Sequence, residues 1–395
     1  MVVTLCHDTR FNLIYFKERM FINLFKHKLI LGKVLLVLFI LLLIGLASSG
    51  CLRTAQPRGW SGATAADDTL FLGSMEGKLV ALNTSSGARL WEVPFEAAKP
   101  AGGFACAASP TAVAIYGTPA VDGDLVYVGD YNGVIYAISR DKGALRWVYP
   151  RMGNLEPIVG GAVVALGKVY IGSSDGKVYA LDAETGDEEW EFQTGDKIWS
   201  TPVIDGDTLY IGSLDKKLYA LMATDGSKRW EFKAEGAIAS TPLVYDNTVY
   251  IGSFDRYLYA VDATDGSLRW KFQAENWFWT RPVAYNGVVY AGCLDGKVYA
   301  LKAKSGAKIA EFDVESPVSS SPVSVDGKVI VASEEGRLYA IDTGNNQIRQ
   351  LANLEEKIYA PLSASQGVVY VHTEKDVLYA VDMPTGAVRE FQFKE

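Results

Sequence analysis

A short phrase ending in Tyr-Ala recurs through most of this 395-residue chain at a constant spacing of 40 residues. In each copy the alanine is followed by an aliphatic residue, and the tyrosines are Tyr179, Tyr219, Tyr259, Tyr299, Tyr339 and Tyr379. A repeat of about 40 residues built only from strand-like segments is typical of β-propeller blades. The spacing therefore predicts an all-β fold.

The repeat from residue 200 to 232 shows how one blade is encoded. Four apolar segments are separated by turn-forming sequences at Asp205-Gly206-Asp207, around Asp215 and at Thr224-Asp225-Gly226. Asp-Gly and Thr-x-Gly sequences supply the positive φ angles of tight hairpins, so four antiparallel strands are expected. Both faces of such a sheet are apolar, and stacking of blades in a closed ring covers both.

The repeats start at about residues 61, 117, 160, 200, 240, 280, 320 and 360. We therefore expect an eight-bladed β-propeller of four-stranded antiparallel blades over residues 61–395, after a signal or anchor segment (1–50) and a short linker (51–60). A tryptophan marks the outer strand of five blades, as Trp91, Trp147, Trp190, Trp230 and Trp270. The last three blades have Ala310, Gln350 and Glu390 instead.

The clearest copy, from Val169 to Phe192, contains Tyr-Ile-Gly-Ser, Asp-Gly-Lys-Val-Tyr-Ala-Leu-Asp-Ala, Thr-Gly and Trp-Glu-Phe. It resembles the PQQ-like (quinoprotein-like) β-propeller repeat. That repeat occurs in PQQ-dependent dehydrogenases and in non-catalytic scaffolds, so it indicates fold more than function. In length and blade number the chain is similar to the BamB-like outer-membrane assembly lipoproteins. This resemblance implies a non-enzymatic scaffold that binds a protein partner.

The N-terminal segment predicts export. Lys26, Lys28 and Lys33 precede an uncharged run over residues 34–47, and Ser48-Ser49-Gly50-Cys51 follows. A basic stretch, a short apolar core and small residues describe a signal peptide, and Cys51 resembles a lipid-attachment cysteine. The alternative is an uncleaved anchor helix over residues 29–47, and translation from Met20 would shorten the segment before it. Either reading predicts a protein tethered to a membrane on the periplasmic or extracytoplasmic side of the cell envelope.

Composition argues against several other functions. Residues 51–395 carry 32 Lys and Arg against 44 Asp and Glu, a net charge near −12, which disfavours binding to nucleic acid. Only Cys51, Cys106 and Cys293 remain in that part, so no disulfide framework is expected. Cys293 stands where other blades have serine or threonine, and we interpret it as a small buried substitute.

Candidate catalytic residues are scarce. His372 is the one histidine after residue 50, and we interpret it as structural, since a triad or metal site would need further partners. Aspartates recur once per blade at hairpin turns, as Asp175, Asp215, Asp255 and Asp295, which indicates turn chemistry. We therefore assign no catalytic, metal or cofactor-binding residue. A PQQ-dependent oxidoreductase or sensor, with PQQ and Ca²⁺, is the alternative, although the adjacent cysteines typical of quinoprotein dehydrogenases are missing.

Differences between blades point to one face of the ring. The loop entering each inner strand and the loop between the second and third strands should share this face, around a central funnel. Aromatic residues and one arginine cluster at these positions, and such residues are favoured at interaction hot spots. The candidates for partner binding are Trp60, Trp199, Trp277, Phe278, Trp279, Arg281 and Tyr359. An insertion of about 16 residues between Trp91 and Pro119 should lie on this face. The alternatives are that these rings plug the funnel or bind carbohydrate.

Overall fold

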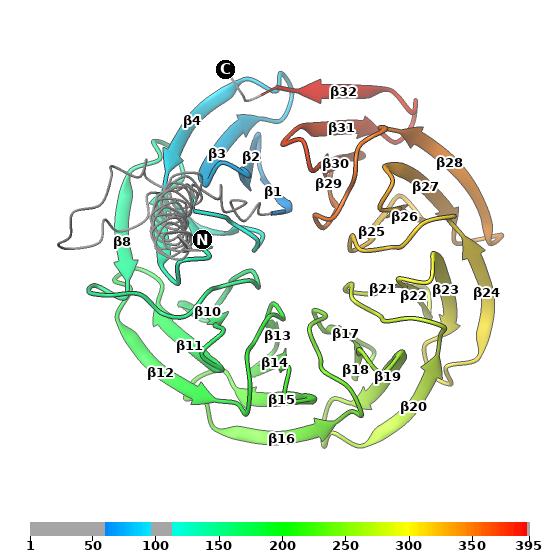
Figure 1. The fold of residues 1–395 in the computed structure, drawn as a ribbon, viewed down its shortest axis with the longest axis horizontal. Coiled ribbons are helices and arrows are strands. Elements are labelled where there is room, and N and C mark those ends of the chain that lie inside the picture. The colour runs from blue at the N-terminus through cyan, green and yellow to red at the C-terminus, as the bar shows by residue number, and fades with distance from the viewer. Residues whose placement is uncertain (1–59, 96–112, 393–395) are drawn as a thin grey trace, which may run out of the picture. The chain divides into compact units, whose positions relative to one another are not determined.

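Eight four-stranded antiparallel sheets form a ring, with each sheet ordered from its innermost to its outermost strand (Figure 1). This computed structural model describes residues 60–95 and 113–392. The chain divides into the units Met1–Gln56 and Pro57–Glu395, and the described residues belong to the second. The predicted eight-bladed, all-β propeller is confirmed.

The strands of blades 1 to 4 are β1 (Ala63–Ala66), β2 (Thr69–Gly73), β3 (Lys78–Asn83), β4 (Arg89–Pro94), β5 (Ala120–Asp122), β6 (Leu125–Gly129), β7 (Ile135–Ser139), β8 (Leu145–Tyr149), β9 (Val163–Ala165), β10 (Lys168–Gly172), β11 (Lys177–Asp182), β12 (Glu188–Gln193), β13 (Val203–Asp205), β14 (Thr208–Gly212), β15 (Lys217–Met222) and β16 (Lys228–Lys233). The strands of blades 5 to 8 are β17 (Leu243–Tyr245), β18 (Thr248–Gly252), β19 (Tyr257–Asp262), β20 (Leu268–Gln273), β21 (Val283–Tyr285), β22 (Val288–Gly292), β23 (Lys297–Lys302), β24 (Lys308–Asp313), β25 (Val323–Val325), β26 (Lys328–Ala332), β27 (Arg337–Asp342), β28 (Gln347–Asn353), β29 (Ser363–Ser365), β30 (Val368–His372), β31 (Leu378–Asp382) and β32 (Val388–Phe391).

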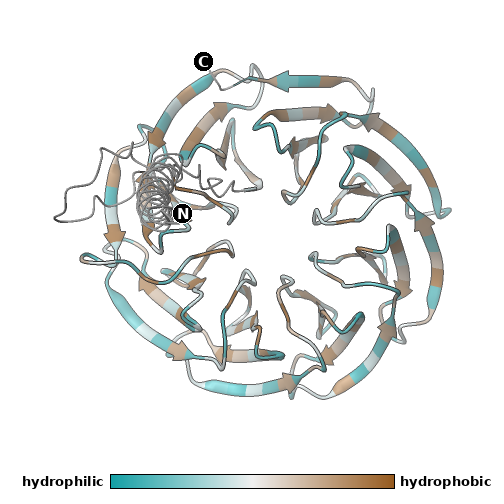
Figure 2. Ribbon diagram, in the orientation of Figure 1, coloured by the Kyte–Doolittle hydropathy of each residue, from teal (hydrophilic) through white to brown (hydrophobic). Residues whose placement is uncertain are grey.

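The core lies between neighbouring blades. In each blade the second and third strands are almost entirely buried, whereas the outer strands alternate polar and apolar residues (Figure 2). The alternation follows from the period of two in a strand that has one face toward solvent. The inner strands contact one another around the ring, including β1 with β29, which joins the two ends of the propeller. No described segment is a helix that is long and apolar enough to cross a bilayer.

The recurring aspartates connect the hairpins to the neighbouring loops. Asp215 accepts hydrogen bonds from the hydroxyl of Tyr219 (2.6 Å) and from the amide of Gly195 in the loop entering the same blade (2.7 Å). Asp255 makes the equivalent bonds with Tyr259 (2.8 Å) and Gly236 (2.9 Å). Burial, together with the carboxylate of Asp215, raises the pKa of Tyr219, so this tyrosine stays a donor. These aspartates are structural, as their repetition predicted.

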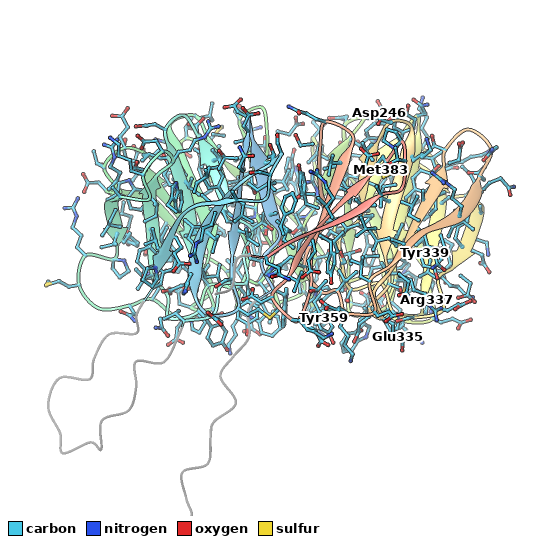
Figure 3. All side chains as sticks on the ribbon, turned by 90° about the horizontal axis from the view of Figure 1, so that it is seen from above. Asp246, Glu335, Arg337, Tyr339, Tyr359 and Met383 are labelled. Carbon is cyan, nitrogen blue, oxygen red and sulfur yellow. The ribbon has the colours of Figure 1, made fainter. Side chains whose placement is uncertain are left out.

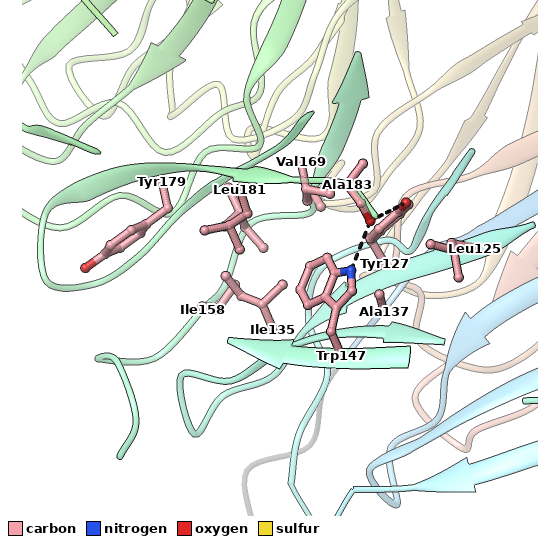
Figure 4. Close-up of a cluster of buried hydrophobic side chains, with 12 residues drawn as sticks. Leu125, Tyr127, Ile135, Ala137, Trp147, Ile158, Val169, Tyr179, Leu181 and Ala183 are labelled. Carbon is pink, nitrogen blue, oxygen red and sulfur yellow. Dashed lines mark hydrogen bonds between the residues drawn. The ribbon is translucent and has the colours of Figure 1, made fainter. Parts of the chain in front are cut away.

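A paired hydrogen bond joins successive blades at the outer tryptophans. Tyr127 and Trp147 both donate to the carbonyl oxygen of Ala183 in the next blade, at 3.1 and 2.9 Å (Figure 4). The same arrangement recurs with Ala223, Ala263 and Ala303 as acceptors. The indole also packs on a glycine of the next blade, where a Cβ on Gly186 would lie 2.5 Å from the Trp147 ring. Tryptophan, tyrosine and glycine of the repeat are therefore coupled across each of these junctions.

The junction between blades 6 and 7 lacks this arrangement. Ala310 replaces the tryptophan, and Asn346 in the next blade replaces the glycine on which the indole would pack. The hydroxyl of Tyr290 remains, but it is buried without a hydrogen-bond partner among the described residues. The sequence changes at this junction thus remove interblade hydrogen bonds as well as apolar contacts.

The single described histidine closes the ring. His372 stands where other blades have Gly212 or Gly252, and its side chain is fully buried. Its Nδ1 donates to the carbonyl oxygen of Ser61 in blade 1 (2.8 Å), and its Nε2 hydrogen-bonds Oδ1 of Asp376 (2.9 Å). The amide of Met75, also in blade 1, donates to the same carboxylate oxygen (2.9 Å). The polar groups of blade 8 thus bind backbone groups of blade 1.

Blade 2 carries its turn carboxylate in an unusual place. Asp130 stands where other blades have a serine such as Ser173, and Asn132 stands where they have the aspartate. The Asp130 carboxylate is fully buried, with bonds from the Val134 amide (2.9 Å) and the Tyr136 hydroxyl (3.1 Å). Burial raises the pKa of Asp130 to about 6, because these two hydrogen bonds do not offset the lost hydration.

Moving this carboxylate to its usual position, with Asp130→Ser/Asn132→Asp, is expected to raise the free energy of unfolding at pH 7 by about 3 kcal/mol. The pKa in the folded state, about 6, exceeds the ordinary 3.8, so the wild type loses stability as the pH rises through this window. The advantage of the variant should vanish as the pH falls from 6 to 4. Urea unfolding between pH 4 and 8 measures this difference.

Asn132→Asp alone is the control, because it keeps the buried carboxylate of Asp130 and adds a like charge beside it, so the loss of stability as the pH rises should persist or deepen. An advantage of the double variant that does not change with pH would contradict the assignment to Asp130.

Candidate functional site

The two ends of the ring carry different connections. The hairpins between first and second strands, marked by Asp246, and those between third and fourth strands, marked by Met383, lie at one end (Figure 3). Tyr359, in a loop entering an inner strand, and Glu335, in a hairpin between second and third strands, lie at the other. Backbone hydrogen bonds join the loops that enter the inner strands to the hairpins between second and third strands. For example, the amide of Leu294 donates to the carbonyl oxygen of Trp277 (3.0 Å). We call the end that carries Tyr359 and Glu335 the aromatic face, and the two kinds of loop share it as expected.

Four aromatic rings form a first cluster on this face. Phe254 is stacked between Trp277, at 4.6 Å and 16°, and Trp279, at 5.4 Å and 12°. Trp199 reaches Trp279 from two blades away, with ring centroids 6.5 Å apart. Trp277 is 41% exposed, so the stack presents an apolar surface to solvent at its outer end. Phe254 was not among the predicted residues, although it lies in the hairpin directly after strand β18.

One predicted partner-binding residue lies in the core instead. Phe278 is 1% exposed and packs with Leu258, Val289 and other residues between blades 5 and 6. It occupies the repeat position of Ile198 and Ile238, both of which are fully buried. The extended chain alternates sides, so the neighbouring tryptophans point toward the aromatic face while Phe278 points inward. Phe278 is therefore a core residue and not part of a partner-binding surface, which corrects the prediction.

A second aromatic cluster spans blades 8, 1 and 2. Trp60 packs edge-on against Tyr116 (4.6 Å, 82°) and lies 5.9 Å from Tyr359. Tyr131 continues the cluster from Tyr116, at 5.3 Å. Neither of these tyrosines was among the predicted residues. The repeat positions could have revealed both, because Tyr116 matches Trp199 and Tyr131 matches Phe254.

A central channel lies in the middle of the ring, between the inner strands, and has a volume of about 600 Å³. Residues of all eight blades line it, mostly proline, valine, threonine and serine, and Arg281 is the one charged side chain among the described lining residues. The side chain remains exposed to the channel, yet the surrounding protein lowers its pKa by desolvation. An arginine keeps its charge despite such a shift.

The described channel does not fit PQQ with Ca²⁺. Calcium takes six to eight oxygen ligands, many of them carboxylates, whereas the described lining contains no Asp, Glu, Asn or Gln. Elsewhere in the described ranges no group of three His, Cys, Asp or Glu side chains is arranged to hold a metal ion. Cys293 is fully buried, its thiol lies 3.3 Å from the carbonyl oxygen of Asn276, and burial raises its pKa to about 12. This thiol is a packing residue, as expected.

Several sequence-based predictions fall outside the described residues. They are the signal or anchor over 1–50, lipid attachment at Cys51, most of the linker 51–60, and most of the insertion before blade 2. Each stays a prediction.

Fold and repeat together define the class of eight-bladed propellers with PQQ-like repeats. A family model described as "Beta-alanine-activating enzyme, beta-propeller" matches residues 157–395, and one described as "Outer membrane protein assembly factor BamB" matches residues 52–201. The chain belongs to the family of the first model, which matches more than half of it, and its first blades match the BamB type of PQQ-like propeller. The predicted resemblance is confirmed.

Two solved structures share this fold. The crystal structure of BamB from Moraxella catarrhalis is 20% identical, covers 80% of this chain and 92% of its own, and has a TM-score of 0.67. The computationally designed Ika8 protein is 14% identical, with coverages of 81% and 95% and a TM-score of 0.69. A search of curated proteins found no match.

Proposed function

We propose that this chain is a non-enzymatic scaffold of the cell envelope whose aromatic face holds a protein partner in outer-membrane protein assembly. The match to the BamB family model supports this role, and the shared fold with BamB of Moraxella catarrhalis agrees with it. The N-terminal segment or a lipid on Cys51 would tether the propeller to a membrane. No nucleic acid is expected to bind, because the domain is acidic.

The first aromatic cluster is the observation that carries the proposal. Trp277 is more exposed than the repeated tryptophans and takes part in no interblade hydrogen bond of the kind described above. Its stacking on Phe254 holds the ring in place before a partner binds, which lowers the entropic cost of association. Large, rigid aromatic side chains of this kind dominate binding energy at protein interfaces.

The double variant Trp277→Ala/Trp279→Ala is expected to lose the partner, since truncation of one central tryptophan can cost more than about 2 kcal/mol. The full-length protein is extracted from membranes, and the proteins that co-purify are quantified by mass spectrometry. A photo-crosslinking amino acid at position 277 should capture the same partner. The fold should remain cooperative, because neither tryptophan donates a hydrogen bond across a blade junction as Trp230 does.

Leu145→Ala/Leu268→Ala is the matched control. These leucines are 57% and 48% exposed and begin outer strands beside the hairpins of the opposite end. The control should keep the partner. Equal loss in both variants, or retention of the partner by the tryptophan variant, would refute the aromatic face as the docking surface.

A further inference from the structure

The loop that enters each inner strand has one equivalent position near the channel, and together the eight residues at this position form a ring. In blade 6 the position lies two residues after Trp279. Seven of its eight members are small or uncharged: Gly62, Thr118, Gly161, Thr201, Thr241, Ser321 and Pro361. The eighth is Arg281, in blade 6. No packing rule of the repeat calls for a guanidinium here, because the other blades close the ring without one.

Arg281 also differs from most other arginines of the propeller. Arginines on the outer surface pair with carboxylates, as Arg229 does with Asp207 (2.5 Å) and Arg269 with Asp262 (2.7 Å). The guanidinium of Arg281 has no hydrogen-bond or ion-pair partner among the described residues, and the described lining of the channel contains no carboxylate. Five N–H donors therefore face the channel without a protein acceptor.

Neighbouring hydroxyl groups can add donors. Ser321 Oγ accepts the backbone N–H of Arg281 (3.1 Å), and Thr201 Oγ1 accepts that of Gly161 (2.7 Å). Each oxygen is thus used as an acceptor, so its own hydrogen can point into the channel. A guanidinium cation with hydroxyl donors on the same ring matches the hydrogen-bonding needs of a carboxylate.

We propose that the channel is a carboxylate-binding site, in which Arg281 receives an acidic side chain of the polypeptide docked on the aromatic face. This source of the carboxylate rests on the proposed function. The acidic domain repels free polyanions, whereas a docked polypeptide can deliver a single negative charge to one guanidinium. Trp279, two residues before Arg281, places the site next to the first aromatic cluster.

The first test concerns the site alone. Purified full-length protein is titrated with sodium glutarate, and binding is followed by calorimetry. Arg281→Ser, which introduces the residue type of Ser321, should bind at least 10-fold more weakly and unfold at an unchanged temperature. Arg281→Lys should fall between them, since lysine lacks the planar fork. Arg349→Ser, which removes an exposed charge on β28, should bind like the wild type. Equal binding by all four proteins would refute the site.

The second test concerns the source of the carboxylate. Arg281→Ser should reduce capture of the co-purified partner at least 10-fold. Arg281→Glu should also reduce capture, and replacing the contacting acidic residue of the partner by lysine should restore it. Unchanged capture, with glutarate binding lost, would mean that a free carboxylate is the ligand and would overturn the polypeptide source. If the wild type captures no protein, the proposed function fails together with this source, and the glutarate titration still decides the site.

Discussion

Replacing Trp230 by alanine is expected to lower the free energy of unfolding by about 3–5 kcal/mol. The indole is 8% exposed, packs 5.7 Å from Tyr210, and donates its Nε1 hydrogen to Ala263 of the next blade (3.0 Å). Alanine would leave a cavity between blades 4 and 5 and remove one of the two donors to that carbonyl oxygen. Urea unfolding, followed by circular dichroism, measures the loss.

Trp277→Ala is the matched control, because it truncates the same residue type at a 41% exposed position. Its cost should be about 1 kcal/mol, the scale of an aromatic stacking contact. A similar loss of stability in both variants would show that the hydrogen bond and burial at the blade junction contribute little.

Replacing Asp376 by alanine is expected to destabilise the propeller by about 3 kcal/mol, through the junction that joins its two ends. Oδ1 of this buried carboxylate hydrogen-bonds the His372 ring and accepts the amide of Met75 in blade 1. Alanine would leave the buried His372 ring and the partly buried amide of Met75 without that acceptor, and an orphaned buried polar group costs about 1–3 kcal/mol. Thermal unfolding and limited proteolysis should both report weakening between blades 8 and 1.

Asp124→Ala serves as the control for this second prediction. Its side chain is 79% exposed, and it pairs with Arg146 at the surface, a contact worth about 1 kcal/mol or less. If Asp376→Ala proved as mild as Asp124→Ala, ring closure would depend on apolar packing such as that of Tyr370 and Phe391 rather than on the buried polar groups.

The sequence by itself determined the number of blades, the strands and the turns. These features depend on contacts close along the chain: Asp205-Gly206 sets a hairpin, and the 40-residue spacing repeats it in register. The composition of the aromatic face also followed, because alternate connections of an up-and-down sheet must lie at the same end. Trp277 and Trp279 could therefore be placed on that face before their surroundings were known.

Tertiary structure alone decided which side chains meet. Phe278 is buried and Phe254 stacks between two tryptophans because of how blades 5 and 6 face one another, across residues distant in sequence. Likewise, the carbonyl oxygen of Ala263 becomes an acceptor for Tyr210 and Trp230 only when the next blade is in place. The charge of Arg281 becomes informative only in the closed ring, where the described lining residues of the seven other blades surround it without offering a carboxylate. Such contacts depend on distances between blades, and no local pattern encodes those distances.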